Sequence, residues 1–377
     1  MKKRINPLFF SLIVAFFLLC GNAATKRESA APGSDEALKF SRFSYIDHEG
    51  TGIEVFSFLM PVDWQFDGGI NWILDNPAMP ATVPFRVYNT KGKDEFEAFT
   101  NRCFFWTTSL ELLIKFPPGT KYFGSVVKLP MNAQAALKKI ILPGERQNFQ
   151  NLKIMSESDL PELAVALGAG KQAKGFGSSR ATGARMRISY TKNGTEMEEE
   201  IFAVVENMTF PVRSLNGTFF NTIWFVDNIF SFKAEKGKLE NQTKIFQTIT
   251  SSFKLNPKWY AKYSNVIEYL AQQQITQIRS IGEFSRMLSQ MSDQMRTEQL
   301  EQFESRGSVY DKVSEKFSDN TLGIDRYYDP YEERQVELPS GYNHAWCNNN
   351  GEYIVTDNPN YNPNVGSNLD WKELERK

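Results

Sequence analysis

The chain has little of what most catalytic sites are built from. It contains two histidines, His48 and His344, and three cysteines among 377 residues. A Ser-His-Asp triad needs a histidine to carry the proton, and the motifs G-x-S-x-G, H-E-x-x-H and C-x-x-C are all absent. We therefore predict no catalytic residues, no metal site and no cofactor.

Long runs of basic residues are missing as well. Lysine and arginine number 43 against 44 acidic residues, which leaves a formal net charge of -1. Affinity for nucleic acid depends on a basic surface that neutralises phosphates. The charge balance therefore argues against a nucleic-acid partner.

The first 24 residues have the pattern of a secretory signal peptide. A basic start, Lys2–Arg4, is followed by an apolar run over 8–19 and by the small residues Gly21-Asn22-Ala23. The run is shorter than the roughly 20 apolar residues that span a bilayer. We expect residues 1–24 to be removed, which takes the net charge from -1 to -4, and 25–38 to be a flexible linker of a periplasmic or extracellular protein.

Cys20 leaves a second fate open for the leader. In bacterial lipoproteins the signal ends at a cysteine that becomes acylated, although the bulky Leu19 departs from the usual residue before it. A soluble product is the favoured hypothesis, and a lipid-anchored form is the alternative. Contact with a membrane is then expected only if Cys20 is acylated.

Two cysteines, Cys103 and Cys347, remain after processing. In an oxidising compartment such a pair permits one disulfide. Two buried free thiols are at least as compatible with the sequence, because the distance between these residues does not follow from it.

Residues 39–256 are predicted to form the main domain. From Phe40 to about Thr108 apolar and polar residues alternate, which is typical of half-buried strands. The clearest hairpin joins 186–190 to 201–205 through Asn193-Gly194, a pair that favours a type I′ turn. Apolar stripes at helical spacing predict helices near 132–141, 159–168 and 239–249. The expected fold class is α+β, an antiparallel sheet with flanking helices arranged as a sandwich.

A long amphipathic helix is predicted over 257–307, where the sequence has no proline after Pro257. Ile281, Phe284, Leu288, Met291 and Met295 are spaced by steps of three and four, as in a coiled-coil seam. The helix packs on its own protein in the favoured hypothesis. A homodimer through the 281–295 seam is the alternative.

The C-terminal part is predicted to be a linker, 308–334, and a small β-hairpin module, 335–377. Four aromatic residues in this module suit stacking on a sugar or peptide, but burial under the hairpin is the favoured hypothesis, since Trp and Tyr are normally well buried. These ligand-binding candidates are Tyr342, Trp346, Tyr353 and Tyr361.

Two features resemble PsbP-like domains. An aromatic strand that ends on a proline and is followed by a tryptophan, Phe56–Pro61 with Trp64, is similar to their opening. Ile249-Thr250-Ser251-Ser252-Phe253 is similar to their closing helix. The resemblance implies an antiparallel sheet flanked by helices, in a family whose members mostly bind or assist other proteins without shared catalytic residues.

Taken together, these patterns predict an exported, non-catalytic binding or assembly protein of the bacterial cell envelope, with an envelope protein or glycan as partner. The alternative is a hydrolase that acts on glycan through paired carboxylates such as Glu198 and Glu200. A charged solvent face explains these residues, with Glu196 and Glu199, without catalysis.

Overall fold

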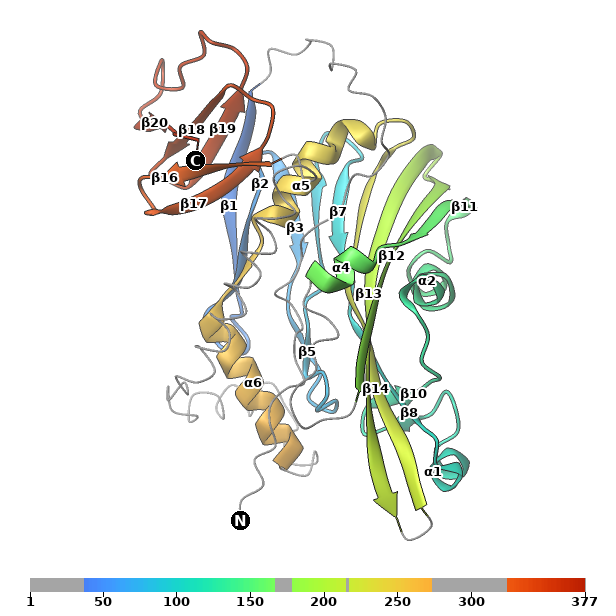
Figure 1. Ribbon diagram of the computed structural model, residues 1–377. Coiled ribbons are helices and arrows are strands. Elements are labelled where there is room, and N and C mark those ends of the chain that lie inside the picture. Colours follow the sequence, from blue (N-terminus) through green and yellow to red (C-terminus); the bar gives the residue numbers. More distant parts are fainter. Residues whose placement is uncertain (1–36, 167–177, 215–216, 273–323, 377) are drawn as a thin grey trace.

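The structure, a computed structural model, describes residues 37–166, 178–214, 217–272 and 324–376. Within these ranges, strands contain far more residues than helices, and nearly all strand pairs are antiparallel. Two large sheets lie on either side of a shared aromatic core, and short helices pack between and outside them (Figure 1).

The first sheet joins the two ends of the described chain. Strand β1 pairs with β19, so that Phe40 lies opposite Tyr353. On its other side β1 pairs with β2, whose residues are nearly all buried. The strand order is β15 (Lys254–Leu255), β2 (Glu54–Pro61), β1 (Leu38–Ile46), β19 (Glu352–Thr356), β18 (His344–Asn348) and β20 (Trp371–Glu373).

The second sheet is built around three long neighbouring strands. Its path is β11 (Gln150–Asp159), β12 (Ser178–Lys192), β13 (Thr195–Ser214), β14 (Gly217–Glu235), β7 (Glu95–Ala98), β6 (Phe85–Asn89) and β3 (Trp64–Gly68). Strand β8 (Arg102–Thr107) pairs with β14 and with β10 (Ser125–Val127), which pairs with β9 (Lys121–Tyr122). Asn193 and Gly194, both with positive φ, form the predicted turn between β12 and β13.

Short elements complete the fold. Two small hairpins are β4 (Asn71–Trp72) with β5 (Ala81–Thr82) and β16 (Ile324–Asp329) with β17 (Arg334–Pro339). The helices are α1 (Leu110–Lys115), α2 (Ala133–Ala136), the π-helix η1 (Leu137–Ile141), α3 (Leu142–Glu145), α4 (Pro161–Ala166), the 3₁₀-helix η2 (Glu240–Gln242), α5 (Thr243–Ser251) and α6 (Pro257–Gln272).

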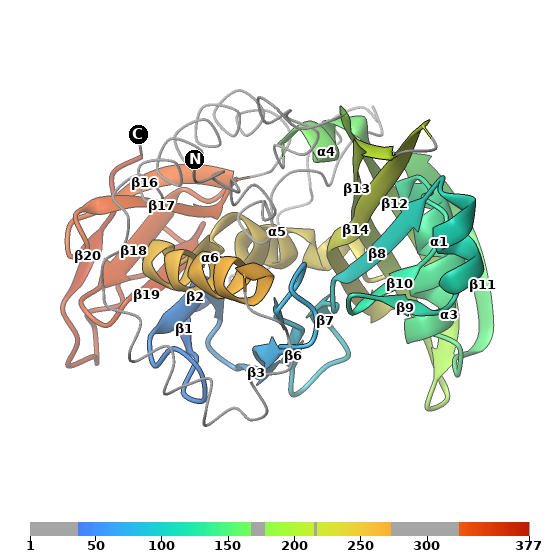
Figure 2. The same ribbon diagram turned by 90° about the horizontal axis from the view of Figure 1, so that it is seen from below.

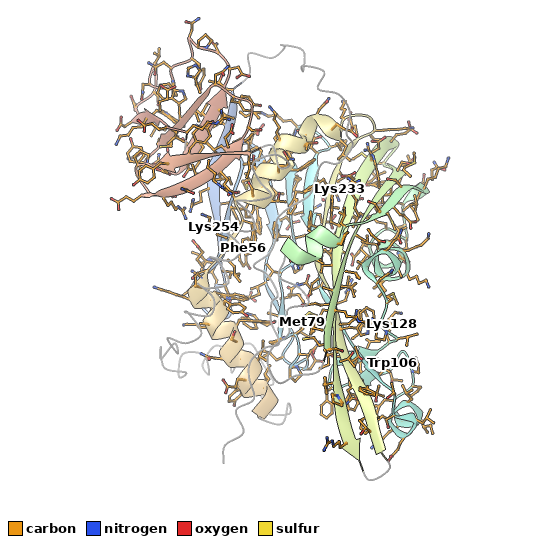
Figure 3. The ribbon with its side chains drawn as sticks, viewed as in Figure 1. Phe56, Met79, Trp106, Lys128, Lys233 and Lys254 are labelled. Carbon is orange, nitrogen blue, oxygen red and sulfur yellow. The ribbon has the colours of Figure 1, made fainter. Side chains whose placement is uncertain are left out.

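Three of the apolar clusters among the described residues hold these layers together. The largest lies between the two sheets and contains stacked rings such as Phe56 on β2 and Phe232 on β14, with α5 and α6 packed against it. A second cluster lies under α2 and η1 on the outer face of the long strands. A third packs the β16–β17 hairpin onto the first sheet (Figure 2). Figure 3 shows Phe56 and Met79 among the interior side chains.

The predicted α+β class is wrong, because the described chain is mainly β. The long strands caused the error: β13 continues past the predicted 201–205 through polar residues and Pro211, where its side chains are half-buried and lose the alternation. Residues 324–329 form strand β16 rather than part of a linker. The hairpin predicted within 335–377 is present as β18 and β19, and it continues the sheet of β1 and β2.

The long helix is a further correction. Among the described residues the helix that begins at Pro257 ends at Gln272 and is 16 residues long. The apolar steps at 281–295 and their dimer seam lie outside the described residues, as do the leader, Cys20 and most of both predicted linkers. No helix in the described part of the chain is long and apolar enough to cross a membrane.

Candidate functional site

The carboxylate pair that a hydrolase would need is occupied by ion pairs. Glu198 Oε2 lies 2.5 Å from Arg187 Nη2, and Arg187 also binds Glu240 through Nη1 at 2.6 Å. Glu200 Oε1 lies 3.8 Å from Arg185, and burial raises the pKa of this carboxyl group. The geometry is that of a paired surface on β12 and β13, which disfavours a free acid and base.

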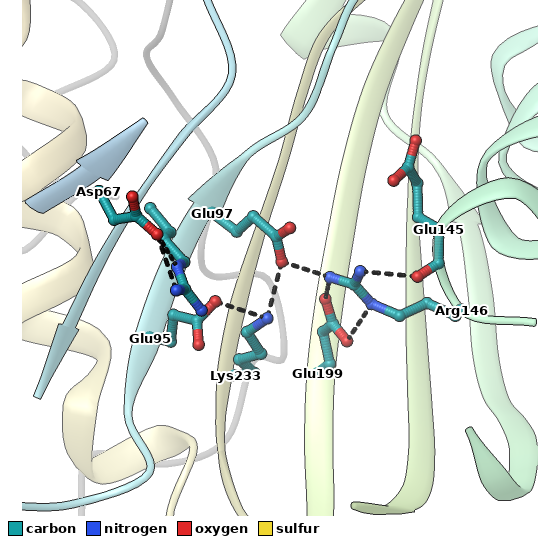
Figure 4. Close-up of polar contacts among 8 residues, drawn as sticks. Asp67, Glu95, Glu97, Glu145, Arg146, Glu199 and Lys233 are labelled. Carbon is teal, nitrogen blue, oxygen red and sulfur yellow. Dashed lines mark hydrogen bonds and ion pairs between the residues drawn. The ribbon is translucent and has the colours of Figure 1, made fainter. Parts of the chain in front are cut away.

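A buried charge network lies on the opposite face of the same strand (Figure 4). Glu199 is fully buried and accepts two hydrogen bonds from Arg146, at 3.0 Å from Nε and 2.7 Å from Nη2. Arg146 Nη2 also donates to Glu97 at 2.6 Å. Lys233 Nζ lies 2.7 Å from Glu97 and 2.8 Å from Glu95. Each charge is thereby compensated, as burial requires.

The pKa values of the network follow from burial and opposite charge. Burial alone would raise the pKa of Glu199, but the charge of Arg146, then that of Lys233, and the hydrogen bonds from Arg146 lower it to about 2. Burial would also raise the pKa of Glu97, but the charges of Lys233 and Arg146 lower it below its usual value. These groups stay charged at neutral pH and do not exchange protons there, which is unsuited to acid–base catalysis.

Strand register and one helix end create the network. Glu199 pairs with Lys233 across β13 and β14, and Lys233 pairs with Glu95 across β14 and β7. Arg146 caps α3 and lies over the rings of Phe99 and Phe149. The network therefore fixes the helical segment α2–η1–α3 on the sheet.

The placement of Glu199 corrects the prediction of a charged solvent face. Met197, Ile201 and Ala203 share its face of β13, and all of them are buried. The two-residue alternation of the sequence therefore contained the signal, because side chains at i and i+2 face the same side of a strand. The three consecutive glutamates, Glu198 to Glu200, concealed it.

A cavity of about 200 Å³ lies beside the network, between the β6–β7 and β12–β13 turns. Lys93, Lys192 and Lys233 line it together with Asp94 and Glu95, so charges of both signs meet there. Burial, followed by the charge of Lys233, lowers the pKa of Lys192. Glu198 and Glu200 do not line it, so this cavity gives no support to the carboxylate hydrolase.

The two cysteines are free thiols in different parts of the core. Cys103 on β8 packs in the cluster between the sheets, and its Sγ lies 3.3 Å from Ser125 Oγ. Cys347 on β18 packs in the cluster under β16 and β17. Burial, the main cause in each case, raises both pKa values to about 12. Of the two alternatives from sequence, the structure has the thiols and no disulfide.

The four aromatic candidates are not brought together on one surface. Tyr353 is fully buried and donates to Asp329 Oδ2 at 2.5 Å. Trp346 lies on the opposite face of the sheet from Tyr353. It pairs with Ile354, whereas the next residue, Cys347, pairs with Tyr353. Tyr342 is half-buried beneath Lys244, and Tyr361 lies half-buried in the tail after β19.

A different surface stands out at the end of the molecule that carries α1. Five large apolar side chains are exposed there, and we call them the apolar end. They are Leu110 (77% exposed), Ile114 (84%), Phe123 (67%), Leu129 (59%) and Phe220 (46%). Figure 3 labels Trp106 and Lys128 in the same region.

Hydrogen bonds and ring contacts connect the members of the apolar end. Thr108, just before α1, exchanges hydrogen bonds with Phe220: the backbone N of Thr108 donates to its carbonyl at 2.9 Å, and Thr108 Oγ1 accepts from its N at 2.8 Å. The ring of Tyr122 contacts Phe116 at the end of α1 and Phe123 beyond it. The exposed side chains of α1, Phe123 and Phe220 are thereby linked through Thr108 and Tyr122. Leu129 follows Lys128, whose backbone N donates to the carbonyl of Phe105 on β8, the strand that leads to α1.

Helix α1 has no buried residue. A helix in a soluble protein normally directs an apolar stripe to the core, and a six-residue helix gains little stability by itself. The exposure of Leu110 and Ile114 therefore has no folding benefit and indicates an interaction surface. Sequence analysis missed it, because 110–115 is too short for a periodic signal.

Comparisons with known proteins add little to this picture. No family model matches the chain, and no curated protein matches it. Among solved structures, the chain is similar to one described as LpqN, involved in cell envelope biogenesis of Mycobacterium tuberculosis. The identity is 12%, the TM-score is 0.21, and the match covers 58% of this chain and 92% of that one. A likeness at this TM-score carries no argument, and the resemblance to PsbP-like domains stays a prediction.

Proposed function

We propose that this chain is an exported, non-catalytic binding or assembly protein of the bacterial cell envelope, and that it binds its partner through the apolar end. The exposure of five large apolar side chains in one neighbourhood is the observation that supports it. The signal-like pattern of residues 1–24 supports export.

Chemistry at the other candidate sites is less well supported. Glu198 and Glu200 are ion-paired, and the buried network is compensated throughout. Within the described ranges, no group of three or more His, Cys, Asp and Glu side chains is arranged to hold a metal ion. A binding role needs none of these groups.

Replacing both Leu110 and Ile114 by Glu is expected to weaken binding to isolated envelope membranes at least tenfold. Burial of such a side chain contributes about 1.5–3 kcal/mol, and about 1.4 kcal/mol is a factor of ten. The measurement is cosedimentation of residues 25–377, a chain that contains every described element, over a range of membrane concentrations.

A matched variant carries Glu at Met155 and Val365, which are also exposed, at 58% and 80%, in other parts of the molecule. It should sediment like the wild type. Both variants should melt like the wild type, since the exchanged side chains are on the surface. Equal binding by all three proteins would refute the role of the apolar end, and absence of binding by the wild type would refute the proposed function.

A further inference from the structure

The apolar end has a cationic surround. Between Trp106 and Met131 the sequence has three lysines, Lys115, Lys121 and Lys128, and one acid, Glu111. Arg213 is the last charged residue of β13, and it is exposed, as are Lys115 and Lys121. Positive charge thus gathers here on a chain whose net charge is -1.

Helix α1 separates its apolar and charged residues. Leu110 and Ile114 are four residues apart and share one face, while Glu111 and Lys115 share the next. The Lys115 Nζ lies 5.7 Å from the centre of the Phe116 ring, so its stem follows an aromatic surface and its charge extends beyond it. This is the side-chain distribution of a helix that lies in a membrane interface.

The apolar residues protrude rather than line a groove. Ile114, Leu110 and Phe123 are each at least two-thirds exposed, and Pro117 and Pro118 beside them are exposed as well. A protein partner would need matching pockets for such side chains and would favour few charges around them. A bilayer accepts protruding side chains without pockets, and anionic headgroups complement the lysines.

We propose that the apolar end binds the surface of a lipid bilayer that contains anionic headgroups. The inference rests on the proposed function and names the partner of the same surface. Leu110, Ile114 and Phe123 enter the boundary between headgroups and acyl chains, while Lys115, Lys121 and Arg213 contact phosphates. This contact does not depend on acylation of Cys20.

The test uses protein-free vesicles and residues 25–377. Vesicles of phosphatidylglycerol and phosphatidylethanolamine are compared with vesicles of phosphatidylcholine alone. The wild type is expected to bind the first kind and to lose affinity as salt is added. A variant with Gln at Lys115, Lys121 and Arg213 is expected to bind them roughly a hundredfold more weakly, since each charge near an anionic surface contributes about fivefold.

The matched control carries Gln at Lys139, Lys153 and Lys372, exposed lysines of η1, β11 and β20. It has the same net charge as the first variant and should bind like the wild type. Equal loss in both variants would overturn the proposal, because it would show attraction by total charge alone.

The remaining outcomes separate this inference from the proposed function. Binding to envelope membranes without binding to vesicles would overturn the lipid proposal and leave the proposed function standing, with an envelope protein as partner. A mass in solution that doubles with concentration, and is restored to that of a monomer by Glu at Leu110 and Ile114, would identify a second copy instead. Absence of binding to either membrane would overturn both.

Discussion

Replacing Arg146 by Met is expected to lower the free energy of unfolding by about 3–5 kcal/mol, because it leaves a buried carboxylate without its partner. Glu199 is fully buried and receives two of its hydrogen bonds from Arg146, which also binds Glu97. Methionine fills a similar volume, so the cost arises from charge rather than from a cavity. Denaturant unfolding measures it.

Arg86 provides the matched control. It binds Asp67 through Nε and Nη2, as Arg146 binds Glu199, but the two side chains are 45% and 58% exposed. Arg86→Met is therefore expected to cost only about 0–1 kcal/mol. Similar losses in the two variants would contradict the assignment of the Arg146 network as the buried anchor of α3.

The pH dependence gives a second readout of the same variant. The folded pKa of Glu199, about 2, lies below its unfolded value of about 4.3. The wild type therefore has the full contribution of this group above that unfolded value and loses it as the pH falls toward 2. Without Arg146, burial should raise the folded pKa of Glu199 instead. The difference in free energy of unfolding between the wild type and the variant should therefore shrink as the pH is lowered from 5 to 3.

Tyr353→Ala is expected to destabilise the protein by about 3–5 kcal/mol, the usual cost of removing a fully buried aromatic side chain. Tyr353 lies opposite Phe40 of β1 and donates to the buried Asp329. The substitution thus opens the cluster that joins the C-terminal hairpin to the first sheet and also deprives a buried carboxylate of a donor. Thermal and denaturant unfolding measure the loss.

Tyr361→Ala is the comparison for this substitution. Tyr361 lies in the irregular tail and is half-buried. Tyr361→Ala should lower the free energy of unfolding by no more than about 1 kcal/mol, as substitutions at the surface usually do. If Tyr353→Ala were equally mild, the C-terminal strands would not be an integral part of the first sheet.

Local chemistry could be predicted from the sequence, and long-range pairing could not. Asn193-Gly194 indicated its hairpin because the turn requires positive φ, which these two residues adopt readily. Nothing local relates Phe40 to Tyr353, which meet across β1 and β19. The joining of the first and last strands into one sheet was therefore outside the reach of pattern analysis.

The candidate sites, too, could be predicted from the sequence only in part. Alternation on β13 could have placed Glu199 on the buried face, but Arg146 and Lys233 reach it only through the packing of α3 and the register of β14. The apolar end combines exposed side chains from α1, Phe123, Leu129 and β14. Whether these side chains are exposed depends on how the rest of the fold packs around them. In the sequence each segment is a short apolar stretch, which could equally belong to a core.

Site-specific fluorescence tests the central claim, that the apolar end is the binding surface, most directly. An environment-sensitive dye is attached through Ile114→Cys in residues 25–377, or through Met155→Cys as the control. Cys103 and Cys347, the native thiols of residues 25–377, are buried with a pKa of about 12, so the introduced cysteine reacts first. With envelope membranes, a blue shift at position 114 and none at position 155 is expected. An unchanged spectrum at 114 in membrane-bound protein, or equal shifts at both positions, would contradict the account.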